Sequence, residues 1–216
     1  AWAMDTYMNM MGHSGKQAVK GVVTGKPIAS GGTVGREKAT AQGLVHCIEY
    51  WAQEKNFNLE GSTMTVQGFG NVGSHTSVIL SKMGVSTIAV GDHSGYLYNP
   101  EGFNPHKLQD YVKKTGSIGG YPAGKAITRD EFFKIKADIF APCALENQVG
   151  EAEAKALQVK LVAEGANGPL APEGEKILID RGIDILPDVL ANAGGVTVSY
   201  FEWVQNKRSE SWTLEE

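Results

Sequence analysis

The sequence predicts an α/β fold in which helices cover both faces of a doubly wound, mostly parallel sheet. From residue 61 onward, short runs of β-branched residues alternate with stretches at helical spacing, which is the pattern of successive strand–helix units. In addition, 27 of the 216 residues are glycine, nearly twice the usual ~7%. Glycine at this level indicates many tight turns between strands and helices, or backbone that a ligand approaches closely.

The expected strands are short runs rich in β-branched and aliphatic residues, at 63–67, 86–90, 137–140, 160–163 and 184–186, with a small β excursion at 96–100. Helical spacing predicts helices at 71–83, 107–114, 151–157 and 195–207. A capping box of Thr128 and Glu131 opens a further short helix, while Pro172 and Gly182 bracket another.

The first sixty residues lie outside this alternation. Apolar residues at helical spacing between Trp2 and Met11 predict a helix whose Met/Trp stripe belongs to a core or to a domain interface. A glycine-rich loop and a long helix over 36–54 follow. Residues 211–216 match the start of another helix, so both ends look interrupted, and we expect the chain to be part of a longer protein.

The composition argues against several classes of protein. With 20 Lys and Arg against 24 Asp and Glu, the net charge of −4 does not favour a nucleic-acid partner. No apolar run approaches the ~18 residues of a membrane span. The two cysteines, Cys47 and Cys143, indicate no disulfide framework and favour a reducing, cytoplasmic compartment. No metal is expected, because the histidines lack metal-ligand spacing; they are His13, His46, His75, His93 and His106.

A glycine-rich turn provides the first indication of function. Residues 68–73 read Gly-Phe-Gly-Asn-Val-Gly, a G-x-G-x-x-G pattern between an expected strand and an expected helix. The three glycines allow a tight turn, close approach of a pyrophosphate, and helix–strand packing. We therefore predict a Rossmann-like dinucleotide-binding domain over 61–216, with N-terminal helices and a glycine-rich loop over 1–60 that lead into it, forming one structural domain overall. Asp92, at the end of the next strand, is suited to a ribose 2′-hydroxyl and favours NAD, with NADP possible.

Three later strand ends carry unusual sequences, at 141–145, 164–169 and 186–195. Ligands of open α/β sheets bind beyond the carboxyl ends of strands. Asn167 and Asn192 lie there among small residues, and an asparagine amide can both donate to and accept from a carboxamide. The alternative is that both side chains only satisfy loop backbone.

Several longer motifs then carry a resemblance to a known family. The chain is similar, over essentially its entire length, to the cofactor-binding domain of the glutamate/leucine/phenylalanine/valine dehydrogenase superfamily, and its tail resembles the glutamate branch. The matching motifs are Gly25-Lys26-Pro27, Gly31-Gly32, and the stretches 35–40, 67–73, 164–167 and 191–203.

This resemblance implies NAD(P)-dependent, reversible oxidative deamination of L-glutamate to 2-oxoglutarate and ammonia. It implies cofactor-binding roles for residues at the turn and the strand ends: Thr40, Gly68, Phe69, Gly70, Asn71, Val72, Gly73, Asp92, Ala144, Asn167 and Asn192. Residues facing the substrate would be Arg36, Asn192, Val196 and Ser199, with Ser199 bonding the side-chain carboxylate. Val196 and Ser199 share one helix face, since they are three residues apart.

The family's catalytic lysine and aspartate belong to K-G-G and P-x-P-D segments, and neither pattern occurs in this sequence. We therefore expect no catalytic residue in this chain, a missing N-terminal domain as partner, and a homohexamer as the complete enzyme. The fragment should bind cofactor but be inactive. Lys26 and Lys38, the lysines nearest the matching motifs, are expected to be solvated or cofactor-side charges.

Two other readings remain open. The chain could be a non-catalytic NAD-binding module, or the cofactor domain of a leucine, phenylalanine or valine dehydrogenase. Ser199 disfavours the second, because an apolar substrate side chain offers nothing for a hydroxyl to bond.

Overall fold

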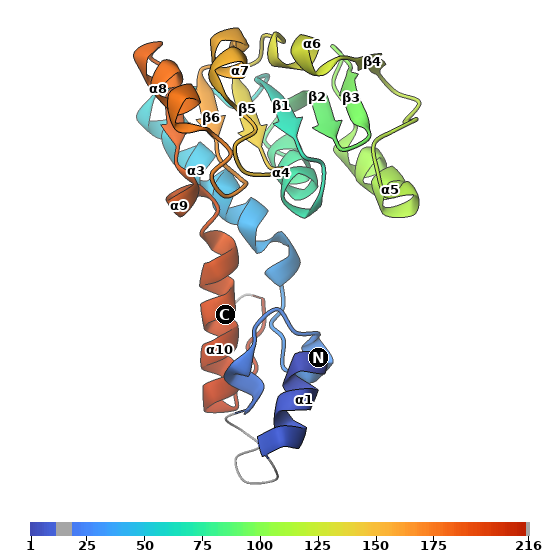
Figure 1. Ribbon diagram of the computed structural model, residues 1–216, viewed down its shortest axis with the longest axis vertical. Coiled ribbons are helices and arrows are strands. Elements are labelled where there is room, and N and C mark those ends of the chain that lie inside the picture. The colour runs from blue at the N-terminus through green and yellow to red at the C-terminus, as the bar shows by residue number, and fades with distance from the viewer. Residues whose placement is uncertain (12–18, 215–216) are drawn as a thin grey trace. The chain divides into compact units, whose positions relative to one another are not determined.

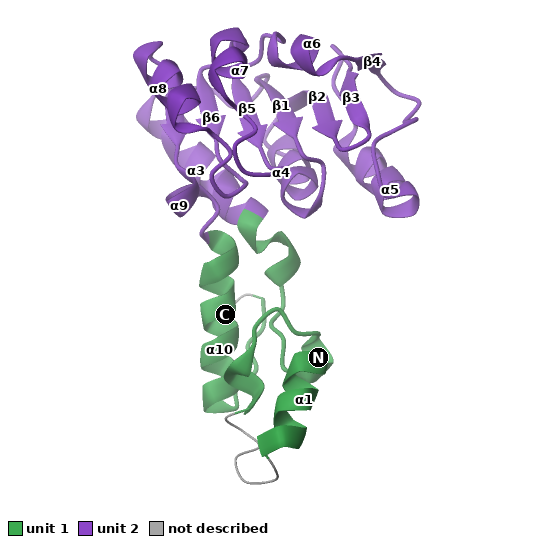
Figure 2. Ribbon diagram, viewed as in Figure 1, with its two compact units in different colours: residues 1–40, 194–216 green, residues 41–193 purple. Residues whose placement is uncertain are grey.

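The computed structural model describes residues 1–11 and 19–214, which divide into two compact units (Figure 2). Unit 1 comprises residues 1–40 and 194–216, and unit 2 comprises residues 41–193. These divisions fall at residues 40 and 193, whereas the sequence analysis treats residues 1–60 as a segment leading into the domain over 61–216; that domain assignment stays a prediction. His13 and the last two residues of the expected C-terminal helix lie outside the described residues, and residues 211–214 are not helical.

Unit 2 is built on a seven-stranded sheet with the order β4-β3-β2-β1-β5-β6-β7. Figure 1 shows the part of this order from β4 to β6. The strands β2 and β5 pair parallel with the central β1, and β6 and β7 continue parallel beyond β5. The strands β3 and β4 add antiparallel beside β2. The bounds are β1 Thr63–Gln67, β2 Ser86–Asp92, β3 Gly95–Tyr98, β4 Lys125–Ile127, β5 Ile139–Pro142, β6 Leu161–Ala163 and β7 Asp184–Leu186.

The helices of unit 2 cover both faces of this sheet. They are α3 Ala39–Glu54, α4 Asn71–Ser81, α5 Pro105–Thr115, α6 Arg129–Phe133, α7 Glu151–Ala156, α8 Pro172–Asp180 and α9 Asp188–Ala191. Side chains of α3, α4 and α5 join one apolar cluster, and those of α6, α7 and α8 join a second. Successive residues of β5 alternate between them, since Ile139 and Ala141 belong to the first cluster and Phe140 to the second. The predicted doubly wound fold is confirmed.

Two short elements of unit 2 escaped the sequence analysis. The strand β4 has three residues and forms by pairing with β3, Ile127 lying opposite Tyr96. The four-residue helix α9 follows Pro187. Elements this short carry no periodicity of their own, so only the partner strand or the neighbouring loop defines them. The capping box of α6 is confirmed: Thr128 Oγ1 accepts from Glu131 N–H at 3.2 Å, and Glu131 Oε2 accepts from Thr128 N–H at 2.7 Å.

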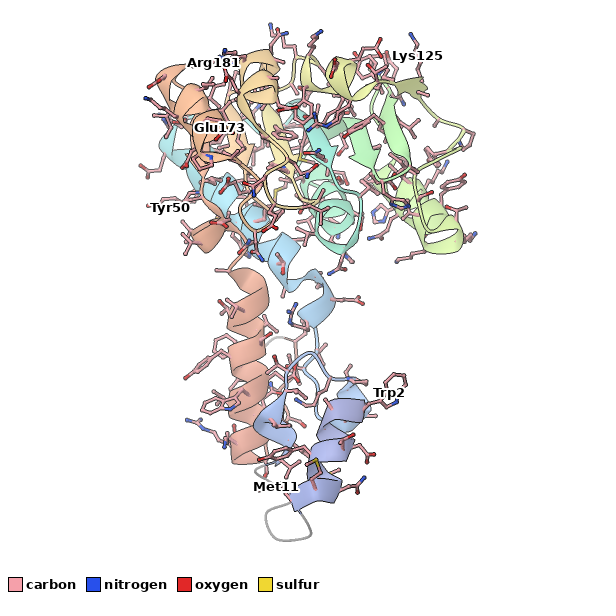
Figure 3. The ribbon with its side chains drawn as sticks, in the orientation of Figure 1. Trp2, Met11, Tyr50, Lys125, Glu173 and Arg181 are labelled. Carbon is pink, nitrogen blue, oxygen red and sulfur yellow. The ribbon has the colours of Figure 1, made fainter. Side chains whose placement is uncertain are left out.

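Unit 1 contains two α-helices among its described residues, α1 Trp2–Met11 and α10 Gly194–Arg208. Three short 3-10 helices lie between α1 and α3, namely η1 Lys20–Val22, η2 Ile28–Ser30 and η3 Arg36–Lys38. The stripe of α1 is largely exposed: Met4 is buried, but Trp2 is 90% and Met11 55% exposed (Figure 3). A core role for the stripe is therefore wrong for these two side chains, while the domain-interface alternative stays a prediction.

A buried ion pair anchors the loop before η2 to α10. The Lys26 Nζ donates to Glu202 Oε1 at 2.5 Å, and the two side chains are 1% and 0% exposed. The same carboxylate accepts from the backbone N–H groups of Gly25 and Lys26, at 2.9 and 3.3 Å. The expectation that Lys26 is a solvated or cofactor-side charge is therefore wrong, because Glu202 compensates its charge inside the unit. Lys38 is exposed, as expected.

None of the helices in the described part of the chain combines the length and apolar character that crossing a membrane requires.

Candidate functional site

The carboxyl end of β1 leads directly into a tight glycine turn. Gly68 has φ +94°, a conformation that favours glycine, and a Cβ there would lie 2.6 Å from the Ala144 nitrogen. At Gly73, a Cβ would lie 2.0 Å from the Gly68 carbonyl oxygen, so the third glycine lets α4 pack against the turn. A Cβ at Gly70 would meet no atom within 4 Å. The middle of the turn is thus open to an incoming ligand, while both ends are closed against side chains.

The start of α4 is suited to an anion. Gly70 is its N-cap residue and supplies no side-chain hydrogen bond to the first turn. The first backbone N–H groups of a helix and its positive dipole end favour phosphate groups. Asn71 and Val72 form this first turn, whereas the side chain of Phe69 is buried in the apolar core and leaves only its backbone at the turn. The glycine turn at 68–73 and the start of α4 therefore fit a pyrophosphate.

Asp92 ends β2, beside the turn at the same edge of the sheet. Its Oδ1 accepts from the Ser94 N–H and O–H at 2.7 and 2.5 Å, and its Oδ2 accepts from Ile118 N–H at 2.8 Å. A carboxylate oxygen has two lone-pair sites, so Oδ2 retains one acceptor site. These bonds hold the carboxylate in place and leave it able to accept from one hydroxyl.

The loop after β5 closes the other side of the turn. The Cys143 N–H donates to Gln67 O at 2.6 Å, which brings Ala144 against Gly68. The Gly165 and Ala166 N–H groups donate to Pro142 O at 3.0 and 2.9 Å. The loop after β6 is thereby fixed to the loop after β5.

Asn167 and Asn192 lie next to each other in unit 2. Asn192 Nδ2 donates to Asn167 Oδ1 at 2.7 Å and to Ala166 O at 3.2 Å. The two strand-end loops that the sequence singled out separately are therefore joined through these amides.

Within unit 1, a second group of candidate residues comes together. Arg36 Nε donates to Ser199 Oγ at 3.0 Å, and Ser199 Oγ donates to Gly195 O at 3.0 Å. A Cβ at Gly195 would lie 2.3 Å from Thr40 Oγ1, so Thr40 lies directly against the start of α10. Val196 is 68% exposed on the same helix. The remaining guanidinium N–H groups of Arg36 are donors of the kind that carboxylates accept.

Two carboxylates that the sequence analysis did not single out also border these loops. Glu164 Oε2 accepts from Asp188 N–H at 2.7 Å, and Asp188 Oδ2 accepts from Gly168 N–H at 2.8 Å. Burial raises the pKa of Glu164 to about 7. Both follow strand ends, as the asparagines do, and that position was the available indication in the sequence. Among the described residues, no group of three or more His, Cys, Asp or Glu side chains has metal-binding geometry.

Comparison with known proteins adds independent information. The family model described as Glutamate/Leucine/Phenylalanine/Valine dehydrogenase matches residues 31–216. The whole chain is 45% identical to a glutamate dehydrogenase of Thermotoga maritima, of which it covers 51%. It is 42% identical to a cryptic catabolic NAD-specific glutamate dehydrogenase of Bacillus subtilis, of which it covers 49%. The chain thus spans about half the length of the curated relatives it matches.

Solved structures give the same picture. A hetero-hexameric glutamate dehydrogenase from Thermus thermophilus, in a leucine-bound form, aligns with a TM-score of 0.91 at 34% identity. The alignment covers 99% of this chain and 50% of that protein. An L-tryptophan dehydrogenase from Nostoc punctiforme aligns with a TM-score of 0.59 at 26% identity, covering 79% of this chain and 48% of that protein.

Proposed function

The chain belongs to the glutamate/leucine/phenylalanine/valine dehydrogenase family, and from this premise we propose that it is the NAD-binding half of a glutamate dehydrogenase. The observation that carries the proposal is the glycine turn at 68–73, which is open at Gly70 and leads into a helix start without a side-chain cap. Relatives named as glutamate dehydrogenases, at 45% and 42% identity, support the glutamate branch.

The proposed reaction is the reversible oxidative deamination of L-glutamate to 2-oxoglutarate and ammonia. Bound NAD would accept a hydride from the substrate α-carbon. The residues of this chain bind and orient the reactants. In the proposal, the turn residues Gly68, Phe69, Gly70, Asn71, Val72 and Gly73 hold the pyrophosphate, Asp92 the ribose and Ala144 the adenosine side. Thr40, Asn167 and Asn192 face the carboxamide of the nicotinamide.

For the substrate, we assign Arg36, Asn192, Val196 and Ser199. Arg36 and Ser199 are hydrogen-bonded at 3.0 Å, which supports a joint role for them at the side-chain carboxylate of glutamate. The Ser199 hydroxyl has a single proton and donates it to Gly195 O, so donation to a substrate carboxylate requires the hydroxyl to rotate. Arg36 has further donors available without such a change.

The cofactor proposed is NAD. Asp92 accepts three hydrogen bonds and keeps one acceptor site, which suits a ribose hydroxyl and repels a 2′-phosphate. Two relatives are named NAD-specific, which supports the same choice.

The complete enzyme requires a second half in this proposal. The chain spans about half of its curated relatives, and we assign the catalytic lysine and aspartate to the other half. Unit 1 exposes large apolar side chains, among them Trp2 at 90% and Met10 at 80%, and such surfaces are typical of interfaces. We propose that the other half covers them, and that full-length subunits assemble as a homohexamer.

Calorimetric titration of this chain with NAD and NADP tests the proposal. We expect NAD to bind, and NADP to bind more weakly. Gly70→Ala should weaken NAD binding at least tenfold, because the added methyl group lies where the pyrophosphate would approach, while the fold has room for it. Gly150→Ala is the matched control, since Gly150 is the N-cap of α7 and has a negative φ, as Gly70 does at α4.

The parent chain failing to bind NAD, or Gly70→Ala binding it as tightly as the parent, would contradict the proposed cofactor site. Activity is tested separately by NADH formation with glutamate. We expect negligible turnover. A rate near the ~10 s⁻¹ typical of enzymes would show that the catalytic groups are not confined to another half.

A further inference from the structure

The loops after β6 and β7 are joined by reciprocal hydrogen bonds from two carboxylates. Asp188 N–H donates to Glu164 Oε2 at 2.7 Å, and Asp188 Oδ2 in turn accepts from Gly168 N–H at 2.8 Å. Glu164 N–H also donates to Leu186 O at 3.1 Å. Each loop therefore supplies a carboxylate that accepts a backbone N–H of the other loop.

The hydrogen bonds of these two carboxylates lie next to the asparagine pair. Asn167 directly precedes Gly168, whose N–H is held by Asp188, and Asn192 lies one helical turn after Asp188. The Asn192 N–H donates to Asp188 O at 3.1 Å. Asp188 therefore hydrogen-bonds to the backbone at Asn192 and directly after Asn167. On its far side, Gly168 O accepts from Asn147 N–H at 2.8 Å, which fixes the loop from a third direction.

The surroundings also fix which way the asparagine amides point. Asn192 Nδ2 faces Ala166 O, and a backbone carbonyl can only accept, so the NH₂ group of Asn192 must lie on that side. The same NH₂ group then requires an oxygen from Asn167, as observed at 2.7 Å. The pair consequently presents Asn167 Nδ2 as a donor and Asn192 Oδ1 as an acceptor. A carboxamide carries the complementary acceptor and donor.

We propose that Asp188 and Glu164 are positioning residues, which hold the Asn167–Asn192 pair in the orientation that hydrogen-bonds to the carboxamide of the nicotinamide. The inference rests on the proposed NAD site and adds two residues to it. Neither carboxylate contacts the cofactor in this proposal. Asp188 acts through the Gly168 N–H, and Glu164 acts through the Asp188 N–H.

The two carboxylates are unequal in their surroundings. Glu164 is buried, 7% exposed, accepts the Asp188 N–H at 2.7 Å, and has a pKa that burial raises to about 7. Asp188 is only partly buried and lies outside the strands, so we expect its substitution to release the Gly168 N–H, at φ +51°, without disturbing the sheet. Asp188 is therefore the better position for a test.

The experiment compares NAD with ADP-ribose, which lacks the nicotinamide, by calorimetric titration of this chain. Asp188→Ala should weaken NAD binding about tenfold, the effect of one hydrogen bond, and leave ADP-ribose binding unchanged. Asp188→Asn should restore NAD binding to within about threefold of the parent, since its amide oxygen can still accept from Gly168 N–H. Asp180→Ala, an exposed aspartate on α8, controls for the loss of one negative charge.

The outcomes separate this inference from the proposed function. If the parent binds neither ligand, the proposed function fails. If the parent binds both but NAD no more tightly than ADP-ribose, or if Asp188→Ala loses affinity equally for both ligands, the positioning role is overturned and the cofactor site stands. Loss with NAD alone, together with recovery in Asp188→Asn, supports the inference.

Discussion

Unit 2 and unit 1 are stabilised in different ways. Unit 2 has an apolar cluster on each face of its sheet, with fully buried side chains such as Met64, Phe140 and Leu178. Among the described residues of unit 1, the buried apolar side chains are only Met4, Val19 and Ala39, while Trp2 and others are exposed. Its buried interior instead contains the Lys26–Glu202 ion pair.

The two units therefore differ in the interactions that hold their interiors together. A sheet covered on both faces buries a large apolar surface, and burial of apolar area is the dominant favourable contribution to folding. A buried ion pair gives orientation but little net stability, because desolvation offsets the attraction between the charges. We therefore expect unit 1 to depend more than unit 2 on specific polar contacts, and four tests examine this contrast.

The largest effect is expected for Phe140→Ala. Phe140 is 0% exposed, and its ring packs against Phe132 and Phe133. Its removal should lower the free energy of unfolding of unit 2 by about 3–5 kcal/mol, through lost burial and a cavity. Phe201→Ala is the matched substitution in unit 1, where the side chain is 44% exposed, and should change stability by less than about 1 kcal/mol. Urea unfolding followed by circular dichroism measures both; equal effects would break the contrast.

Lys26→Met addresses the polar interior of unit 1. It leaves Glu202 buried without its cation, which should cost about 3–5 kcal/mol locally. The Gly25 and Lys26 N–H groups donate to Glu202, so their amide hydrogen exchange reports the change directly.

Adding Glu202→Gln to Lys26→Met should recover most of the protection, because the amide oxygen still accepts these bonds without a buried charge. Lys38→Met, at an exposed lysine, serves as control. Unchanged exchange at Gly25 in Lys26→Met would show that the ion pair does not hold the loop before η2 against α10.

The third test concerns the buried carboxyl group of Glu164 in unit 2. Burial raises the pKa of Glu164 from 4.5 to about 7, with the carboxylates of Asp188 and Glu175 adding to the shift. The folded chain thus keeps a proton that the unfolded chain releases, so this contribution to stability is present below pH ~4.5 and is lost as pH rises to about 7. It amounts to at most about 3 kcal/mol.

Urea unfolding of the parent and of Glu164→Gln between pH 5 and 8 measures this dependence. Relative to Glu164→Gln, the parent should lose free energy of unfolding as pH rises. Asp138 provides the opposite case. Burial acts to raise its pKa, but its bonds with Lys160 and Thr63 outweigh this and lower the pKa, so the contribution of Asp138 to the stability of the folded chain is lost as pH falls. A parent-to-variant difference independent of pH would mean that Glu164 titrates normally in the folded chain.

The smallest effect is expected for Thr128→Ala, which removes the capping box of α6. Loss of the Thr128 Oγ1 acceptor for Glu131 N–H should cost about 1 kcal/mol. Thr128→Ser keeps the acceptor and should be nearly neutral. Urea unfolding distinguishes them, and equal stability of both variants would show that local capping adds nothing measurable to the apolar packing of unit 2.

Patterns of adjacent residues predicted much of the fold. The alternation of strands and helices, the glycine turn at 68–73 and the capping box depend on neighbours within a few positions, so one sequence suffices to find them. The strand β4 and the helix α9 were missed because their partners decide them. Lys26 was misjudged because its partner Glu202 lies 176 residues away in the sequence.

The sequence by itself determined the fold class, the order of the strand–helix units and the family resemblance, since hydrophobic periodicity and glycine positions are local properties. Only the tertiary structure decided which distant polar groups meet. It joined Arg36 to Ser199, Lys26 to Glu202, and Asp188 to both Glu164 and Gly168. The physical reason is that a hydrogen bond depends on a distance in space, which chain folding sets and sequence separation does not.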